Sequence, residues 1–230
     1  MDTHLTACVK TIKGPGRPKQ FDREHALDKA LVLFWRHGYE ATSMSDLVAA
    51  TGAKAPTLYS EFGNKEGLFR AAAEHYIALF AERSKALLAD ETRPLSDVLW
   101  DYLRDAAAMF TDEALPSGCF LICTSAALST ASNDVALMLR ARHHRQEDML
   151  LAFFRQRQAT GELAGEIDAA GLAKNLVCAL HGMSVQAREG AGRDDLHAIA
   201  ATWMAVWPAL ALPRRIPKLE AGMMGKKSKA

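Results

Sequence analysis

Two short helical segments on either side of one glycine constrain the fold of this chain most. They lie in SDLVAATGAKAPTLYSEFGNKEGLF, residues 45–69, with Gly52 between them. Each segment has only about two turns, and helices this short are marginal in water unless they pack on other elements. With a glycine at the corner, they must meet at a steep angle around Leu47 and Leu58. The spacing therefore predicts a helix-turn-helix over about residues 43–62.

The rest of the chain is also patterned as helix. Apolar residues recur at three- and four-residue spacing, and no run alternates as a half-buried strand does. We expect a first helix that begins after Asp22 and ends at Gly38. Its apolar face consists of Leu27, Ala30, Leu31, Phe34 and Trp35. The predicted fold class is all-α.

Capping residues mark the other helix starts. Ser43 and Asp46 have the spacing of a capping-box variant, Pro56 suits a first helical turn, and Asn64 precedes a longer helix. Beyond residue 80 the pattern predicts helices over 94–111, from near Cys119, from a cap at Asn133, over 168–188 and from Asp194 onward. Within the Asn133 helix, the run RHHR at 142–145 is interpreted as a solvated face.

The second helix of the predicted helix-turn-helix has the small and polar outer face that entry into a DNA major groove requires. A groove about 12 Å wide admits one α-helix. Lys54, Ala55 and Thr57 are expected to face base edges, through an ammonium donor or apolar contact with a thymine methyl group. Ser60 belongs to the same outer face. The partner expected from this pattern is double-stranded DNA.

Other side chains of the motif are better suited to the phosphate backbone. Lys65 lies at the start of a helix, where its charge and the helix N–H groups favour a phosphate, and Tyr59 can donate a phenolic hydrogen bond. We include Ser43 in this DNA-binding set. The alternative for Tyr59 is a partly buried aromatic ring that supports the corner.

Charge is distributed unevenly along the chain. The formal net charge is +1, with +3 in residues 1–21 and +5 from residue 213 onward, which leaves −7 in residues 22–212. Basic extensions favour a polyanion partner. In the segment KGPGRPKQ, Arg17 and Lys19 are expected to enter a minor groove. The alternative is that the arm and the tail are solvated, disordered ends.

The segment from residue 16 to 75 resembles the DNA-binding domain of the TetR/AcrR family of bacterial transcriptional regulators. The resemblance rests on the LF and GY pairs of the first helix, the Thr42–Ser43 pair, and the pattern TLY..F..KE.LF. It implies an all-helical homodimer with a small-molecule pocket in the C-terminal domain. We therefore expect an arm at 1–19, a DNA-binding domain at 20–80, a ligand-binding and dimerisation domain at 81–212, and a disordered tail at 213–230.

A pocket between the middle helices would have mostly apolar walls, which favours a hydrophobic or aromatic effector. The candidate lining residues are Met109, Phe110, Phe120, Cys123, Met149, Phe153 and His181. The alternative for each of them is plain core. Bound effector is expected to release the repressor from a palindromic operator.

The last two predicted helices have broad apolar faces that suit a four-helix bundle with a second copy, which is also the usual dimer interface of the resembled family. The candidate interface residues are Leu176, Leu180, Met183, Trp203 and Trp207. The alternative is a core that faces its own chain.

No glycine-rich phosphate loop, nucleophile elbow or spaced metal-ligand set occurs, so we expect neither an enzyme nor a cofactor or metal. Two other functions stay open. Cys119 and Cys123, four residues apart, would suit a redox- or metal-responsive regulator, and the helical body alone would suit a small-molecule binding protein without operator recognition. With no apolar run of about 18 residues, we expect a cytoplasmic protein and no membrane partner.

Overall fold

The computed structural model describes residues 21–128 and 132–211, apart from the side chains of residues 81–83, and all regular structure in these ranges is α-helical. Arg17, Lys19 and the basic tail lie outside the described residues. The helices are α1 (Arg23–Ala41), α2 (Met44–Thr51), α3 (Ala55–Phe62), α4 (Lys65–Leu88), α5 (Leu95–Phe110), α6 (Phe120–Ala126), α7 (Asn133–Ala159), α8 (Ala169–Arg188) and α9 (Arg193–Leu210). In this part of the chain, no helix has the length and apolarity needed to cross a membrane.

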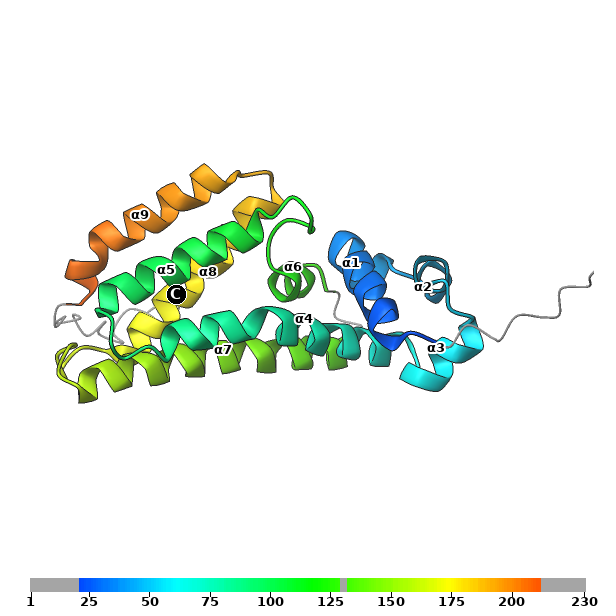
Figure 1. Ribbon diagram of the computed structural model, residues 1–230, viewed down its shortest axis with the longest axis horizontal. Helices are drawn as coiled ribbons and strands as arrows, with labels where there is room; N and C mark the ends of the chain where they lie inside the picture. Colours follow the sequence, from blue (N-terminus) through cyan, green and yellow to red (C-terminus); the bar gives the residue numbers. More distant parts are fainter. Residues whose placement is uncertain (1–20, 129–131, 212–230) are drawn as a thin grey trace, which may run out of the picture.

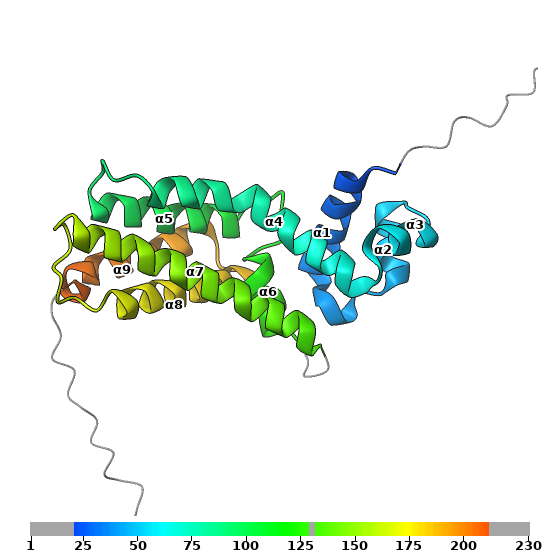
Figure 2. The same ribbon diagram turned by 90° about the horizontal axis from the view of Figure 1, so that it is seen from below.

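The helices form an elongated molecule with α1–α3 at one end and α5, α8 and α9 at the other (Figure 1). The long helices α4 and α7 run side by side along the molecule, and α6 lies between the two ends (Figures 1 and 2). The boundary expected at residue 80 falls inside α4. One continuous helix therefore joins the N-terminal unit to the body.

Helix starts follow the capping chemistry of the sequence. The Asp22 carboxylate accepts the His25 N–H at 3.0 Å, and Asn64 accepts the Gly67 N–H at 2.8 Å. Two expectations are corrected. Gly38 has the positive φ of 81° but only kinks α1, which continues to Ala41, and the cap of α7 is Ser132, one residue before Asn133.

Two hydrophobic cores stabilise the molecule. The first joins α1–α4 and includes the predicted apolar face of α1, with Phe34 and Trp35 almost fully buried. This core also receives Phe120 from α6 and Leu139 from α7. Because side chains of the body complete the core of the N-terminal unit, the relative position of the two parts is set by packing as well as by the α4 connection.

The second core lies within the body and contains all five residues expected at the dimer interface. Leu176 and Met183 have no exposed surface, and Trp203 and Trp207 are 8% exposed in the single chain. The Trp203 indole N–H donates to Asn175 Oδ1 at 2.9 Å within the same chain. This corrects the expectation: the apolar faces of α8 and α9 pack on α5 and α7, so these residues have little surface left for a partner subunit.

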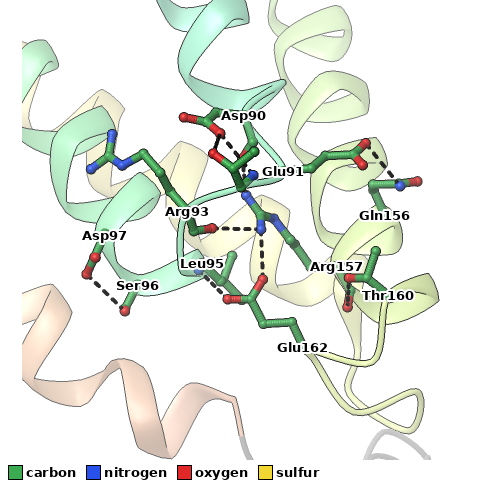
Figure 3. Close-up of polar contacts among 11 residues, drawn as sticks. Asp90, Glu91, Arg93, Leu95, Ser96, Asp97, Gln156, Arg157, Thr160 and Glu162 are labelled. Carbon is green, nitrogen blue, oxygen red and sulfur yellow. Dashed lines mark hydrogen bonds and ion pairs between the residues drawn. The ribbon is translucent and has the colours of Figure 1, made fainter.

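A buried arginine joins the loops at the far end of the body (Figure 3). Arg157 is 3% exposed, and its guanidinium donates to the Asp90 and Arg93 carbonyl oxygens at 2.5 and 2.9 Å and to Glu162 Oε2 at 2.8 Å. The second Glu162 oxygen accepts the Leu95 N–H at the start of α5. The α4–α5 connection is thereby tied to the end of α7.

Candidate nucleic-acid interface

The corner between α2 and α3 is built as a rigid helix-turn-helix. Gly52 ends α2 in the left-handed conformation, with φ 67°, and its N–H donates to the Val48 carbonyl oxygen at 3.1 Å. The buried Thr51 hydroxyl donates to the Leu47 carbonyl oxygen at 2.7 Å and accepts the Ala53 N–H at 3.2 Å. These contacts fix the direction in which the chain leaves α2.

The inner face of α3 is buried, and its outer face is available to a partner. Leu58 is 1% exposed and Phe62 is 9% exposed, whereas Tyr59 is 48% exposed. Lys54 and Ser60 are also exposed, and Ala55 and Thr57 are partly exposed. The structure thus brings five predicted DNA contacts together at the tip of the molecule, and Figure 1 shows α3 there, away from the body.

Lys65 has contacts within the chain that the sequence did not reveal. Its ammonium donates to the Tyr39 carbonyl oxygen at 3.0 Å and lies 4.3 Å from the centre of the Tyr39 ring. An ammonium has three donors, so two remain for a phosphate. Lys65 therefore also joins the start of α4 to the end of α1.

Ser43 is engaged in helix capping. Its hydroxyl accepts the Asp46 N–H at 3.1 Å and donates to the Asp46 carboxylate at 2.6 Å, while the Ser43 N–H donates to the same carboxylate at 2.9 Å. These bonds lower the pKa of Asp46, which stays ionised at the start of α2. Ser43 keeps an exposed position beside the corner, but its hydroxyl already has protein partners.

The seven residues expected to line one effector pocket are divided among several places. Met109, Phe110, Met149 and Phe153 pack with the body core. Phe120 has no exposed surface and packs against Trp35 and Phe69 in the N-terminal core, because α6 crosses toward α1. Cys123 lines a cleft beside α1. These residues therefore do not share one cavity.

His181, the polar candidate of that set, faces a second histidine in the interior. The ring centres of His143 and His181 are 5.0 Å apart, and the buried Nε2 atoms of both have no hydrogen-bond partner among the described residues. Burial lowers the pKa of His143 to about 4 and also lowers the pKa of His181. The solvated-face interpretation of RHHR is wrong for His143, and its helical spacing from the buried Leu139 and Leu150 was the signal that could have shown this.

Cys119, the cap residue of α6, lies in a setting that disfavours thiolate chemistry. The Tyr76 hydroxyl donates to Cys119 Sγ at 3.3 Å, and burial raises the pKa of the Cys119 thiol. Cys123 Sγ is 3.7 Å from the Ser184 hydroxyl. No group of three or more metal-ligating side chains occurs in the described part of the chain.

An exposed recognition helix on an all-helical scaffold defines a helix-turn-helix DNA-binding protein. Residues 26–72 match the family model of bacterial regulatory proteins of the tetR family, and residues 96–202 match that of the tetracyclin repressor-like C-terminal domain. The chain belongs to the TetR family. It is a DNA-binding transcriptional regulator, and the expectation that it is not an enzyme is confirmed by this family membership.

Similar proteins include repressors and a DNA complex. The chain is 51% identical over 210 residues to the HTH-type transcriptional repressor ComR of Escherichia coli K12, covering 91% of this chain and 99% of that one. It is 28% identical to the repressor BdcR of the same organism, covering 84% and 92% of the two chains. A cysteine mutant of the TetR family regulator CifR, solved with 26-base-pair operator DNA, is 32% identical, with a TM-score of 0.79 over 84% of this chain and 100% of that chain.

Proposed function

We propose that this regulator is a repressor that binds a palindromic operator as a homodimer and is released by a small hydrophobic or aromatic effector. The observation that carries the proposal is the exposed outer face of α3. The helix lies at the tip of the molecule, and its inner face is buried in the helix-turn-helix. The likeness to ComR and to the DNA-bound CifR supports repression through operator binding.

Contacts of α3 divide into base-reading and phosphate-binding groups. Lys54 and Thr57, at the start of the recognition helix, read base edges, and Tyr59 binds phosphate. Selection of bound fragments from random duplexes identifies the operator. Thr57→Val should then change which bases are selected, whereas Tyr59→Phe should weaken all selected duplexes by a similar factor. Equal binding of the unmodified protein to the operator and to a scrambled duplex would refute operator recognition.

The homodimer uses the outward faces of α8 and α9 in place of the buried residues first expected. Val206 of α9 is a large apolar side chain that remains 47% exposed in the single chain. In a two-fold dimer, the recognition helices must be about 34–36 Å apart, or a multiple of this distance, to reach successive major grooves. Light scattering should give a dimer for the unmodified protein and a monomer for Val206→Asp. A monomeric unmodified protein at micromolar concentration would refute this assembly.

The effector binds in the body, between α5, α7 and α8, with His143 and His181 as its polar anchors. Neutral imidazoles with buried, unpaired nitrogens favour a ligand with one hydrogen-bonding group on an apolar frame. Linkage is reciprocal. If bound effector lowers the affinity of the protein for the operator tenfold, bound operator must lower its affinity for the effector tenfold, which is a coupling free energy of about 1.4 kcal/mol. A screen for compounds that release the operator identifies the effector. His181→Leu should then weaken effector binding, and it should leave operator affinity unchanged when no effector is present. A body-bound ligand that leaves operator affinity unchanged would contradict the switch.

A further inference from the structure

A cleft of about 250 Å³ lies where α1 meets α6 and the end of α8, outside the body interior assigned to the effector. Figure 1 shows α6 between the N-terminal unit and the body at this level. The lining residues that matter here are Trp35, Gly38, Cys123, Ala127, Val185 and Arg188. The cleft therefore lies at the junction between the N-terminal unit and the body.

Trp35, one of the residues that line the cleft, has a buried donor without an acceptor. Trp35 is 1% exposed, and its indole N–H has no hydrogen-bond partner in the part of the chain that the structure describes. Its ring packs on Tyr76, Phe80 and Phe120. None of these ring contacts gives the N–H a hydrogen-bond acceptor, and a buried polar group without a partner is unfavourable. An oxygen atom placed in the cleft would satisfy it.

Charges in the lining favour a neutral ligand. Arg188 is the cation of the lining, and Glu189 beside it on the chain is the carboxylate. One Arg188 nitrogen already donates to the Arg36 carbonyl oxygen at 2.7 Å, which joins the end of α8 to α1. The remaining lining combines apolar surface from the indole ring, Ala126, Ala127 and Val185 with the side chains of His37, Cys123 and Thr124.

We infer that this cleft is a second small-molecule site, for a compact neutral ligand with an apolar frame and one carbonyl or ether oxygen that accepts the Trp35 N–H. The volume is below the roughly 300–1,000 Å³ of drug-sized pockets, so the ligand is about the size of one substituted aromatic ring. Its position beside the kink at Gly38 and the Arg188 bond places the ligand at the junction that sets the orientation of α1.

The indole N–H itself reports on this site. The chain has four tryptophans, so a protein labelled with ¹⁵N-tryptophan gives four indole N–H cross-peaks in an NMR spectrum. Acetophenone should move the Trp35 proton downfield, because its carbonyl oxygen accepts the bond, and ethylbenzene, of similar shape without an acceptor, should not. The Trp203 proton, already bonded to Asn175, should stay in place. Trp35→Phe assigns the peak, and single Trp100→Phe, Trp203→Phe and Trp207→Phe variants assign it by elimination if Trp35→Phe does not fold.

Variants separate this cleft from other sites. Ala127→Phe fills the cleft and should abolish the acetophenone shift, and Ala152→Phe, at an exposed position of α7, should leave it unchanged. His181→Gln in the body should also leave it unchanged, which keeps the result independent of the effector proposal. The inference is overturned if the Trp35 peak stays in place up to the solubility limit of acetophenone, if ethylbenzene causes the same downfield shift, or if the shift persists in Ala127→Phe.

Discussion

At the scale of single residues, Lys65 has a structural role beside the DNA-binding role that we propose for it. Its ammonium is held by the Tyr39 carbonyl oxygen and ring while two donors remain for a phosphate. Lys54, at the cap of α3, is exposed and makes no capping bond with its side chain. Removing Lys65 should therefore affect both stability and DNA affinity, whereas removing Lys54 should affect DNA binding alone.

Substituting Lys65 by Ala should weaken binding to all duplexes by a similar factor. One fewer phosphate contact reduces the slope of log affinity against log salt by about one. The lost bond to Tyr39 should also lower the free energy of unfolding by about 1 kcal/mol. Salt-dependent anisotropy titrations and urea unfolding measure these effects. Lys54→Ala is the control, and it should change the base preference and leave the free energy of unfolding unchanged. A change of base preference in Lys65→Ala would contradict a phosphate contact for Lys65.

The half-buried His143 should make folding stability depend on pH. Its pKa of about 4 in the folded chain, lowered first by burial and then by His181, is below the usual value of about 6.5 expected for the unfolded chain. Between these values the unfolded chain binds a proton that the folded chain does not, so stability falls as pH falls from about 6.5 toward 4. The urea midpoint should decrease from pH 7 to pH 5, and less so in His143→Gln. The exposed His25→Gln is the control and should keep the full dependence, and equal dependence in His143→Gln and His25→Gln would refute the assignment.

At the scale of helices, the start of α6 is held against α8 by a glycine. Gly118 has φ 78°, and a Cβ atom there would lie 2.6 Å from the Ser184 carbonyl oxygen and 2.8 Å from Cys123 Sγ. The next residue, Cys119, donates its N–H to the Ser184 hydroxyl at 2.8 Å. Because the Ser184 carbonyl oxygen is a backbone atom, no side-chain rotation relieves that clash, and α6 cannot pack this closely on α8 with any other residue at this position.

Gly118→Ala should therefore displace α6 from α8 and lower the free energy of unfolding by about 3 kcal/mol, from backbone strain and overpacking together. Gly52→Ala is a matched control, because Gly52 has φ 67° with nothing near the position of a Cβ atom. It should cost only about 1 kcal/mol for the left-handed conformation. Urea unfolding of both variants gives the comparison, and equal losses would show that the contact with Ser184 is unimportant.

At the scale of the whole molecule, α4 is attached at both ends. At its start, Lys65 of α4 donates to the Tyr39 carbonyl oxygen of α1. In its middle, Glu74 forms an ion pair with Arg142 of α7, and Arg157 binds the loop that follows α4. A change in the body can therefore reach the recognition helix through one continuous helix. The contacts at the far end provide the fixed point for such a movement.

Removing the Arg157 guanidinium should loosen the far end of α4. Arg157→Met loses hydrogen bonds to two loop carbonyls and leaves Glu162, whose side chain is 33% exposed, without its cation. A loss of about 2–3 kcal/mol is expected, below that of a fully buried pair. Hydrogen exchange should accelerate in residues 88–95 and stay unchanged in α2 and α3. Arg155→Ala, at an exposed position of the same helix, is the control, and unchanged exchange in residues 88–95 of Arg157→Met would contradict this role.

The sequence by itself determined the local features of this protein. The all-α class, the corner at Gly52, the capping box of Ser43 and Asp46, and the cap at Asn64 were predicted and are present. Each depends on residues within about four positions of one another, so backbone preference and hydrogen bonding at short range are sufficient. The exposed face of α3 follows from the same periodicity, which is why the candidate DNA-binding residues could be expected at the surface.

Only the tertiary structure decided what each apolar face packs against. Helical periodicity shows that Trp203 and Trp207 are buried, but a partner subunit and the chain's own α5 and α7 would leave the same pattern. For the same reason, only the tertiary structure showed that Phe120 packs apart from the body residues, that His143 faces His181, and that Arg157 binds loop carbonyl oxygens. Burial energy depends on the apolar area removed from water and not on the identity of the covering surface, so the sequence pattern does not contain this choice.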